Sequence, residues 1–295
     1  MPNFSLNLLS MLLIIQTPIL LAALASHAAS RSGYFNVAIE GIMVLGAFFG
    51  VLFSHYLQNA FLALCLCLIV GVLQGILLYY LDRTLQINSI LVGIAYNLFA
   101  IGLSSTLLGL IGDRGISTSL EPVSFERYSI MIFESEIYFN FPVILSLVVI
   151  VIIYIFNNKT IIGNQIRAVG KSTEFSMLSG LNINKYKAIS ILISASLASM
   201  AGASLTLGYL PWFSRGMVAG RGFIGLAIDA MGGGSVILTS FMAFIISNVF
   251  TLTSHQSLFS IKPELLEIIP YIVVFIIIIG INQFKRIKNK MYYKK

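Results

Sequence analysis

Apolar stretches of about twenty residues recur along the whole chain, and they limit its possible folds more than any other feature. A helix of that length crosses the roughly 30 Å hydrocarbon core of a bilayer. Only 10% of the residues are charged and 58% are hydrophobic, so the chain lacks the polar residues that cover a soluble domain of this size. The sequence therefore predicts an all-α fold, a polytopic transmembrane helical bundle that forms one domain over residues 1–295.

Eight stretches are long enough for membrane helices. They cover residues 8–29, 37–54, 60–81, 87–111, 140–156, 188–209, 235–252 and 265–284. The first stretch has the apolar core and the small-residue end of a signal peptide. It lacks a basic segment before that core and its apolar part is too long, which favours a first membrane helix.

Basic residues predict which side of the membrane each loop faces, because Lys and Arg accumulate in cytoplasmic loops. The loop at 157–187 contains five Lys or Arg residues and one acidic residue, and the tail at 282–295 contains six Lys or Arg residues. The loop at 111–140 instead holds five acids against two arginines. We expect the two basic segments in the cytoplasm and the acidic loop outside. The net charge of +7 then reflects orientation and not nucleic-acid binding.

The tail reaches the cytoplasm only if the chain crosses the membrane four times after the loop at 157–187. Three regular helices are available there, so one more passage is needed. The remaining candidate is the segment at 216–234, which is too short and too rich in glycine for a regular spanning helix. Because non-helical backbone survives at membrane depth only inside protein or beside water, we expect a broken or re-entrant element against the translocation path. The bundle then has about 8–10 helices.

Two carboxylates stand inside apolar segments, where a charge requires a partner or a cavity. Glu40 follows Asn36 by four residues in SGYFNVAIEGIMVLGAFFG, so both lie on one helix face. That face either lines the path or uses Glu40 to pair internally and fix helix packing. Asp229 lies in the glycine-rich segment and either contacts solute or pairs with Arg221.

Aromatic and amide side chains complete the predicted substrate path. Tyr34 and Phe35 precede Asn36 in the same motif, and Tyr96 and Asn97 lie on a later helix. The aromatic rings and Asn36 offer contacts for a nucleobase and a ribose. Asparagine also joins helices in lipid, which is the alternative role for Asn97. The predicted path residues are Tyr34, Phe35, Asn36, Glu40, Tyr96, Asn97 and Asp229.

The basic loop contains VGKST at 169–173, which invites comparison with a phosphate-binding loop. Such a loop has the pattern GxxxxGK[ST], but Gln165 occupies the first glycine position and no strand is expected before it. The loop is better explained by a short helix that docks into a cleft of a partner protein. The predicted docking residues are Arg167, Gly170, Lys171 and Gly180.

The histidines and cysteines give no sign of a reactive centre. His27, His55 and His255 are far apart and show no acid–histidine spacing. Cys65 and Cys67 lie in one apolar run, where they act as small apolar fillers. We expect no catalytic site, no metal and no cofactor.

Three blocks of sequence resemble one family of transport proteins. They are FNVAIEGIMVLGAFFG at 35–50, RAVGKSTEFSMLSGLNINKYK at 167–187, and AGASLTLGY together with AGRGFIGLAIDAMGGG at 201–234. Their order and spacing are similar to those of the permeases of the branched-chain amino acid, ribose and nucleoside group of ATP-binding cassette (ABC) importers, and within it to the shorter nucleoside-type subunit. FSML departs from this pattern, because the family has small residues there.

The resemblance implies a permease in a bacterial cytoplasmic membrane, surrounded by lipid, that moves a small solute. It also implies three partners: a second related permease, a cytoplasmic ATPase, and an extracytoplasmic solute-binding lipoprotein. The loop at 157–187 is then the coupling element that sits in a groove of the ATPase, and Asn36 and Glu40 lie beside the path. A nucleoside is the expected solute. The alternatives are a sugar, a branched-chain amino acid, or ion-coupled secondary transport through Glu40 and Asp229.

Overall fold

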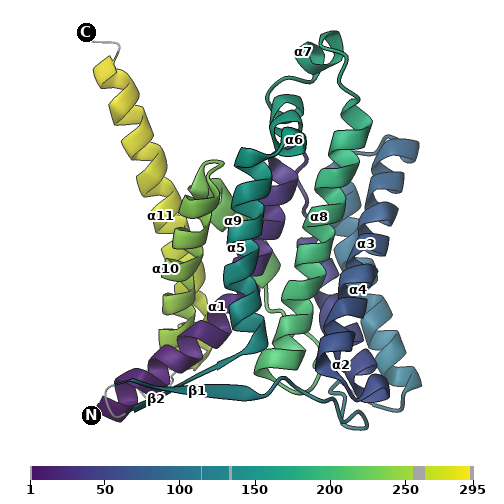
Figure 1. Ribbon diagram of the computed structural model, residues 1–295, viewed down its shortest axis with the longest axis vertical. Helices are drawn as coiled ribbons and strands as arrows, with labels where there is room; N and C mark the ends of the chain where they lie inside the picture. The colour runs from purple at the N-terminus through teal and green to yellow at the C-terminus, as the bar shows by residue number, and fades with distance from the viewer. Residues whose placement is uncertain (1, 114, 133–134, 255–262, 293–295) are drawn as a thin grey trace.

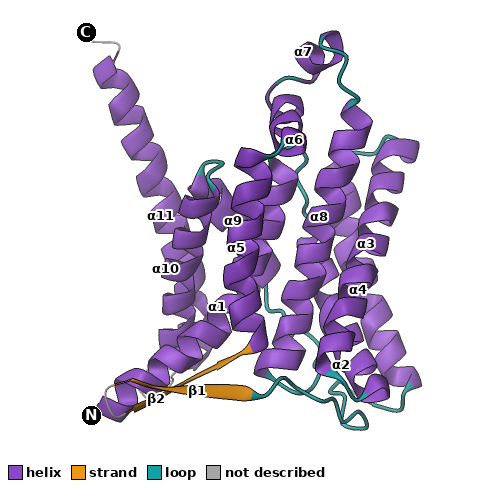
Figure 2. Ribbon diagram, viewed as in Figure 1, coloured by secondary structure: helices purple, strands orange, loops and turns teal. Residues whose placement is uncertain are grey.

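The computed structural model describes residues 2–113, 115–132, 135–254 and 263–292. It is a bundle of long helices with one small β-hairpin at one end (Figures 1 and 2). Within the described residues, seven helices are long and apolar enough to cross a membrane. The prediction of a polytopic helical bundle is confirmed.

The helix bounds agree closely with seven of the eight predicted ranges, whereas the stretch at 265–284 lies in a helix whose apolar part, Ile268–Gly280, is shorter than a candidate span. The candidate spans lie in α1 (Pro2–Ser30), α2 (Ile39–Leu57), α3 (Ala60–Leu85), α4 (Ser89–Leu110), α5 (Phe141–Lys159), α8 (Ile183–Ser204) with its π-helical continuation η1 (Leu205–Tyr209), and α10 (Val236–Ser254). The other helices are α6 (Ile161–Lys171), α7 (Thr173–Leu178), α9 (Arg221–Gly232) and α11 (Pro263–Tyr292). α8 begins before its apolar stretch because the side chain of Asn182 accepts a hydrogen bond from the backbone N–H of Lys185 at 3.1 Å and so caps the helix.

The charged segments lie at two opposite ends of the bundle (Figure 1). α6, α7 and the C-terminal end of α11 lie at one end, which we call the basic end. The N-terminus and the hairpin lie at the other. The basic loop and the last helix are therefore on the same side and the acidic loop is on the opposite side, which is the arrangement that the charge pattern predicts.

The acidic loop contains a β-hairpin that the hydropathy pattern does not predict. β1 (Arg127–Ile132) and β2 (Ser135–Asn140) pair antiparallel, with Arg127 opposite Asn140. The backbone N–H of Tyr138 in β2 donates to the Oγ of Ser10 in α1 at 2.9 Å. The hairpin thus packs on the first helix, and its isoleucine and tyrosine residues are types that favour strands.

Two groups of four helices, α1 to α4 and α8 to α11, have opposite orientations in the bundle. α1 packs against α8, α9 and α10, whereas α8 packs against α1, α2 and α3. The helices α1 to α4 thus correspond to α8 to α11, and the second group is inverted because α1 ends near α6 whereas α8 starts from α7 at the same end (Figure 1). Inverted repeats of this kind place a binding site at their interface.

Glycines allow the two repeats to approach closely. A Cβ added to Gly46 on α2 would strike the backbone of Ser199 on α8, and one added to Gly202 on α8 would strike the backbone of Met43 on α2. In lipid, such packing of small residues replaces the hydrophobic drive that joins helices in water. These glycines therefore determine how closely α2 and α8 pack.

Two non-helical segments interrupt the helices at corresponding places in the two repeats. Residues 31–38 separate α1 from α2, and residues 210–220 separate η1 from α9. With 12 residues, α9 is about 18 Å long and falls well short of the roughly 30 Å needed to span the bilayer. The glycine-rich segment is thus a broken element, as the parity of the basic segments predicts.

Candidate functional site

The start of α2 is built around Asn36, which is buried. Its Oδ1 accepts a hydrogen bond from the backbone N–H of Ala38 at 3.2 Å. Its Nδ2 donates to the Oγ of Ser194 on α8 at 2.9 Å. One side chain therefore organises the turn into α2 and ties that turn to the other repeat.

Asn97 on α4 holds the other side of this turn. Its Nδ2 donates to the backbone carbonyl of Val37 at 3.0 Å, and its Oδ1 accepts from the backbone N–H of Gly41 at 2.8 Å. A Cβ added to Gly41 would lie 2.8 Å from that Oδ1, so only glycine fits here. Asn97 thus acts as a link between helices in this structure.

Glu40 joins the two interrupted elements. Its Oε1 accepts a hydrogen bond from the backbone N–H of Gly220 at 2.9 Å, and its Oε2 accepts one from that of Gly222 at 2.8 Å. Both donors lie at the N-terminus of α9, where unpaired N–H groups and the helix dipole attract a carboxylate. Both oxygens of this buried side chain are therefore engaged inside the protein.

Glycine is required on the α9 side of this contact. Gly220 has a φ of +73°, in the left-handed region that other residues avoid. A Cβ added to Gly222 would lie 2.7 Å from the Cα of Glu40. The glycines that make this segment unfit for a regular spanning helix are the ones that let its backbone reach the carboxylate.

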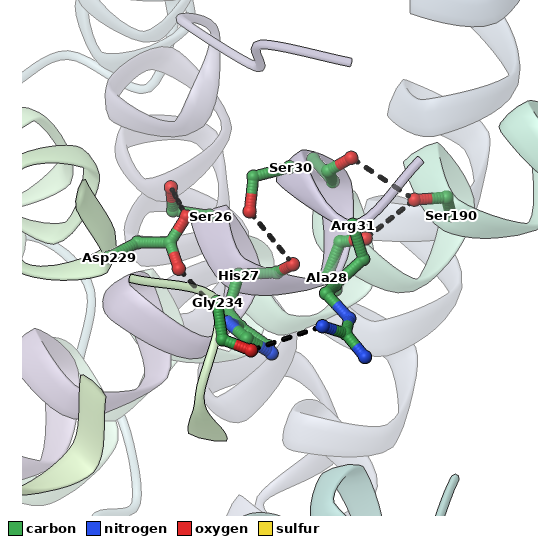
Figure 3. Close-up of polar contacts among 9 residues, drawn as sticks. Ser26, His27, Ala28, Ser30, Arg31, Ser190, Asp229 and Gly234 are labelled. Atoms are coloured by element: carbon green, nitrogen blue, oxygen red, sulfur yellow. Dashed lines mark hydrogen bonds and ion pairs between the residues drawn. The ribbon is translucent and has the colours of Figure 1, made fainter. Parts of the chain in front are cut away.

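Asp229 lies two turns farther along α9, about 10 Å from Gly222. Its Oδ1 is 3.0 Å from the Nδ1 of His27, and its Oδ2 accepts a hydrogen bond from the Oγ of Ser26 at 3.2 Å (Figure 3). His27 is fully buried and Asp229 nearly so. The fold thus brings together an acid and a histidine that are 202 residues apart, a pairing that sequence spacing missed.

The pairing of Asp229 with Arg221, one of the two roles considered for this aspartate, is wrong. The Nη1 of Arg221 donates to the carbonyls of Met217 at 2.7 Å and Val218 at 3.2 Å. Its guanidinium lies 5.9 Å from the ring centre of Phe250. Positions 221 and 229 are about 12 Å apart along one helix, too far for a direct ion pair.

The aromatic residues of the predicted path are dispersed. Tyr34 is buried, whereas 49% of Phe35 is exposed. Tyr96 donates from its hydroxyl to the Oε1 of Gln74 on α3 at 2.8 Å, and it lines an apolar groove of about 470 Å³ between α3 and α4. The neighbouring Asn97 binds the turn into α2, so these two adjacent residues of α4 face different helices.

The predicted docking residues on α6 lie beside the turn that follows α1. Arg167 and Lys171 are exposed at the basic end. A Cβ added to Gly170 would strike the backbone of Arg31 and lie 2.9 Å from the backbone nitrogen of Gly33. α6 therefore rests directly on the segment that leads into α2.

α7 presents an apolar tip that the sequence reasoning missed. Phe175, Met177 and Leu178 are 69%, 67% and 88% exposed at the basic end (Figure 1). Gly180 follows with a φ of +75° and turns the chain toward α8. The sequence did carry a sign of this tip, because FSML stands where the family has small residues. Apolar side chains exposed outside a membrane helix are typical of an interface with another protein.

These features define the chain as a polytopic membrane transport protein. It has interrupted helices and buried polar side chains between inverted repeats. Among the described residues, no three His, Cys, Asp or Glu side chains cluster as a metal site would require. A model of the family "Branched-chain amino acid transport system / permease component" matches residues 8–278, and the chain belongs to this family. Its members are non-catalytic membrane subunits.

Several relatives are permeases of transport systems. The nucleoside ABC transporter permease protein NupC of Lactococcus lactis is 26% identical over 90% of this chain and 89% of its own length. The guanosine ABC transporter permease protein NupQ of Bacillus subtilis is 26% identical over 75% of this chain and 73% of its own length. The fructose import permease protein FruG of Bifidobacterium longum is 24% identical over 83% of this chain and 72% of its own length. No solved structure matches the chain significantly. The chain is thus a transmembrane permease subunit of an ABC transporter.

Proposed function

We propose that this chain is one of two related permease subunits of an importer that carries a nucleoside through a bacterial cytoplasmic membrane. The relatives support this solute, because NupC and NupQ are nucleoside and guanosine permeases and NupC matches along almost its whole length. A separate cytoplasmic ATPase hydrolyses the ATP, and an extracytoplasmic lipoprotein delivers the solute. The basic end then faces the cytoplasm, the side that Lys and Arg favour.

The junction of α2 and α9 is the structural observation that carries the proposal of a path through this chain. Both elements begin inside the bundle, between inverted repeats, and Glu40 bridges them. In transporters, interrupted helices of this kind line the solute site. We assign Asn36, Glu40 and Asn97 to positioning this junction, because their polar atoms already bind backbone groups or Ser194.

Direct contact with the solute then falls to side chains beside the junction. Phe35 exposes half of its surface directly before Asn36, so its ring offers a stacking surface for a nucleobase. Stacking of one base on an aromatic side chain contributes about 1–3 kcal/mol. Asp229 lies nearer the basic end, and both of its oxygens are engaged by His27 and Ser26, so we assign it to holding the inner part of the path together.

Coupling to the ATPase follows from the packing of the basic loop. The exposed apolar tip of α7 docks into the ATPase, and α6 behind it contacts the turn at residues 31–33 through Gly170. That turn leads directly into Asn36 and Glu40. Closure of the ATPase can therefore move the junction through a short chain of packed elements, which is the physical requirement for coupling.

Uptake of labelled uridine and adenosine tests the solute assignment. Cells that lack this chain should lose uptake, and the restored gene should return it. Labelled fructose and leucine, measured in the same cells, test a sugar and a branched-chain amino acid. Unchanged nucleoside uptake after deletion contradicts the proposal. Transport by the purified chain alone under a proton gradient favours the ion-coupled alternative.

A further inference from the structure

A polar pocket of about 420 Å³ opens at the basic end, between α6, the end of α1 and the C-terminal part of α9. We call it the basic pocket. Its lining includes Arg31, Arg167, Lys171, Asp229 and Gly234. It lies at the C-terminal end of α9, away from the Glu40 bridge, because Asp229 is two turns beyond Gly222.

The charges in the basic pocket do not balance. Three cationic side chains face one carboxylate, that of Asp229. Both oxygens of this carboxylate are already engaged by His27 and Ser26. In the part of the chain that the structure describes, Asp229 forms its ion pair with His27 and none with the pocket's cations. The guanidinium and ammonium groups therefore lack a direct acidic partner there.

Arg31 shows this shortage most clearly. Its Nη1 donates to the carbonyl of Gly234 at 3.1 Å (Figure 3), whereas its buried Nε finds no hydrogen-bond partner among the described residues. Burial lowers the pKa of the Arg31 guanidinium, the nearby positive charge of Arg167 lowers it further, and the more weakly acting charge of Asp229 only partly offsets this. Two guanidiniums that share a pocket repel each other, so an anion between them stabilises both.

Ordinary enrichment of basic residues on the cytoplasmic side does not account for this arrangement. Such residues usually stand in solvated loops, as the exposed Lys159 does at the end of α5. Arg31 and Arg167 instead converge on one cavity from separate parts of the chain. Convergence of this kind favours the binding of a compact anion.

We propose that the basic pocket binds a phosphate group, carried either by a free cytoplasmic phosphate or by an anionic lipid headgroup. Guanidinium groups suit phosphate because their planar forks donate paired hydrogen bonds to its oxygens. The bound anion links Arg31, in the turn that leads into α2, with Arg167 on α6. It therefore steadies the contact between the coupling loop and the path. The proposal requires the basic end to face the cytoplasm and does not depend on which solute is carried.

Phosphate binding to the assembled transporter tests this proposal in two arms. In the first, the complete transporter is held in nanodiscs of phosphatidylcholine, and the binding of radiolabelled inorganic phosphate is measured. In the second, the nanodiscs also contain phosphatidylglycerol, and native mass spectrometry counts the phosphatidylglycerol molecules retained by the protein. Arg167→Gln removes an exposed guanidinium that makes no hydrogen bond within the described residues. Lys159→Gln is the matched control, because it removes a cation at the same end outside the pocket.

We expect wild type and K159Q to bind equally and R167Q to bind about tenfold more weakly in at least one arm. A dependence on Arg167 also separates this site from the nucleotide sites of the ATPase. Loss in the first arm identifies free phosphate, and loss in the second arm alone identifies the lipid headgroup. Equal binding by wild type and R167Q overturns the proposal. Absence of binding in both arms also overturns it, and an acidic side chain of the ATPase then becomes the candidate partner.

Discussion

Replacement of Glu40 by glutamine tests the bridge between α2 and α9. The wild-type carboxylate accepts the backbone N–H groups of Gly220 and Gly222, one on each oxygen. Glutamine keeps the shape of the side chain, but its Nε2 carries hydrogens and cannot accept a hydrogen bond. One N–H at the start of α9 therefore loses its partner inside the protein, and the other loses a charged acceptor.

The size of the effect follows from this geometry. A hydrogen bond to a charged group contributes about 1.5–3 kcal/mol, and a negative charge at a helix N-terminus adds about 0.3–1 kcal/mol. Only one of the two hydrogen bonds is lost outright. We therefore expect Glu40→Gln to lower the free energy of unfolding by about 2–4 kcal/mol, with the loosening concentrated in α9.

Equilibrium unfolding in mixed micelles, followed by circular dichroism, measures this change. Hydrogen exchange of peptides that cover residues 216–232 measures the loosening of α9 directly, and its rate should rise. Glu121→Gln is the matched control, because Glu121 is exposed in the acidic loop. An unfolding free energy for E40Q within about 0.5 kcal/mol of the control, with unchanged exchange in α9, refutes the bridge.

Three further predictions test other parts of the molecule. Gly170→Ala drives a Cβ into the backbone of Arg31, so solute-stimulated ATP hydrolysis should fall although the chain still inserts; Gly102→Ala, which enters open space, should leave hydrolysis unchanged. Leu178→Asp places a charge on the apolar tip of α7 and should release the ATPase during copurification, whereas a retained ATPase contradicts docking through this tip. Asp113 accepts hydrogen bonds from the hydroxyls of Ser119, at 2.6 Å, and of the adjacent threonine, and these bonds lower the pKa of its carboxyl. Because the pKa is lower in the folded state, this stabilisation is complete above the ordinary aspartate pKa of about 3.9 and disappears as the pH falls through the folded value. Protection of residues 115–120 from hydrogen exchange, corrected for the intrinsic pH dependence of amide exchange, should therefore fall in acid in the wild type, and Asp113→Asn should remove that dependence.

Membrane spans and the separation of basic from acidic segments could be predicted because they depend on properties summed over neighbouring residues. The predicted helices at 60–81 and 140–156 correspond to Ala60–Leu85 and Phe141–Lys159. The parity of the basic segments predicted an irregular passage at 216–234, where the structure places the short helix α9. The hairpin escaped because its short strands lie in a polar loop, where hydropathy carries little information.

The candidate site could be predicted in its residues and not in its contacts. Asn36, Glu40 and Asn97 stood out because polar groups inside a membrane segment require partners. The structure supplies those partners from other helices: Gly222 is 182 residues from Glu40. Tyr96, next to Asn97, faces α3 instead of the turn into α2, which the order of residues along one helix does not reveal.

The sequence by itself therefore determined the membrane class, the approximate helices, the basic end and the positions that need polar partners. Each of these follows from local hydropathy or charge, which are summed over residues close together in the sequence. The tertiary structure alone decided that α1 packs on α8, that Glu40 reaches α9, and that Asp229 pairs with His27 instead of Arg221. Apolar helices are nearly equivalent in hydropathy, so the choice between them depends on the shape of glycine-lined surfaces that only the packed bundle brings together.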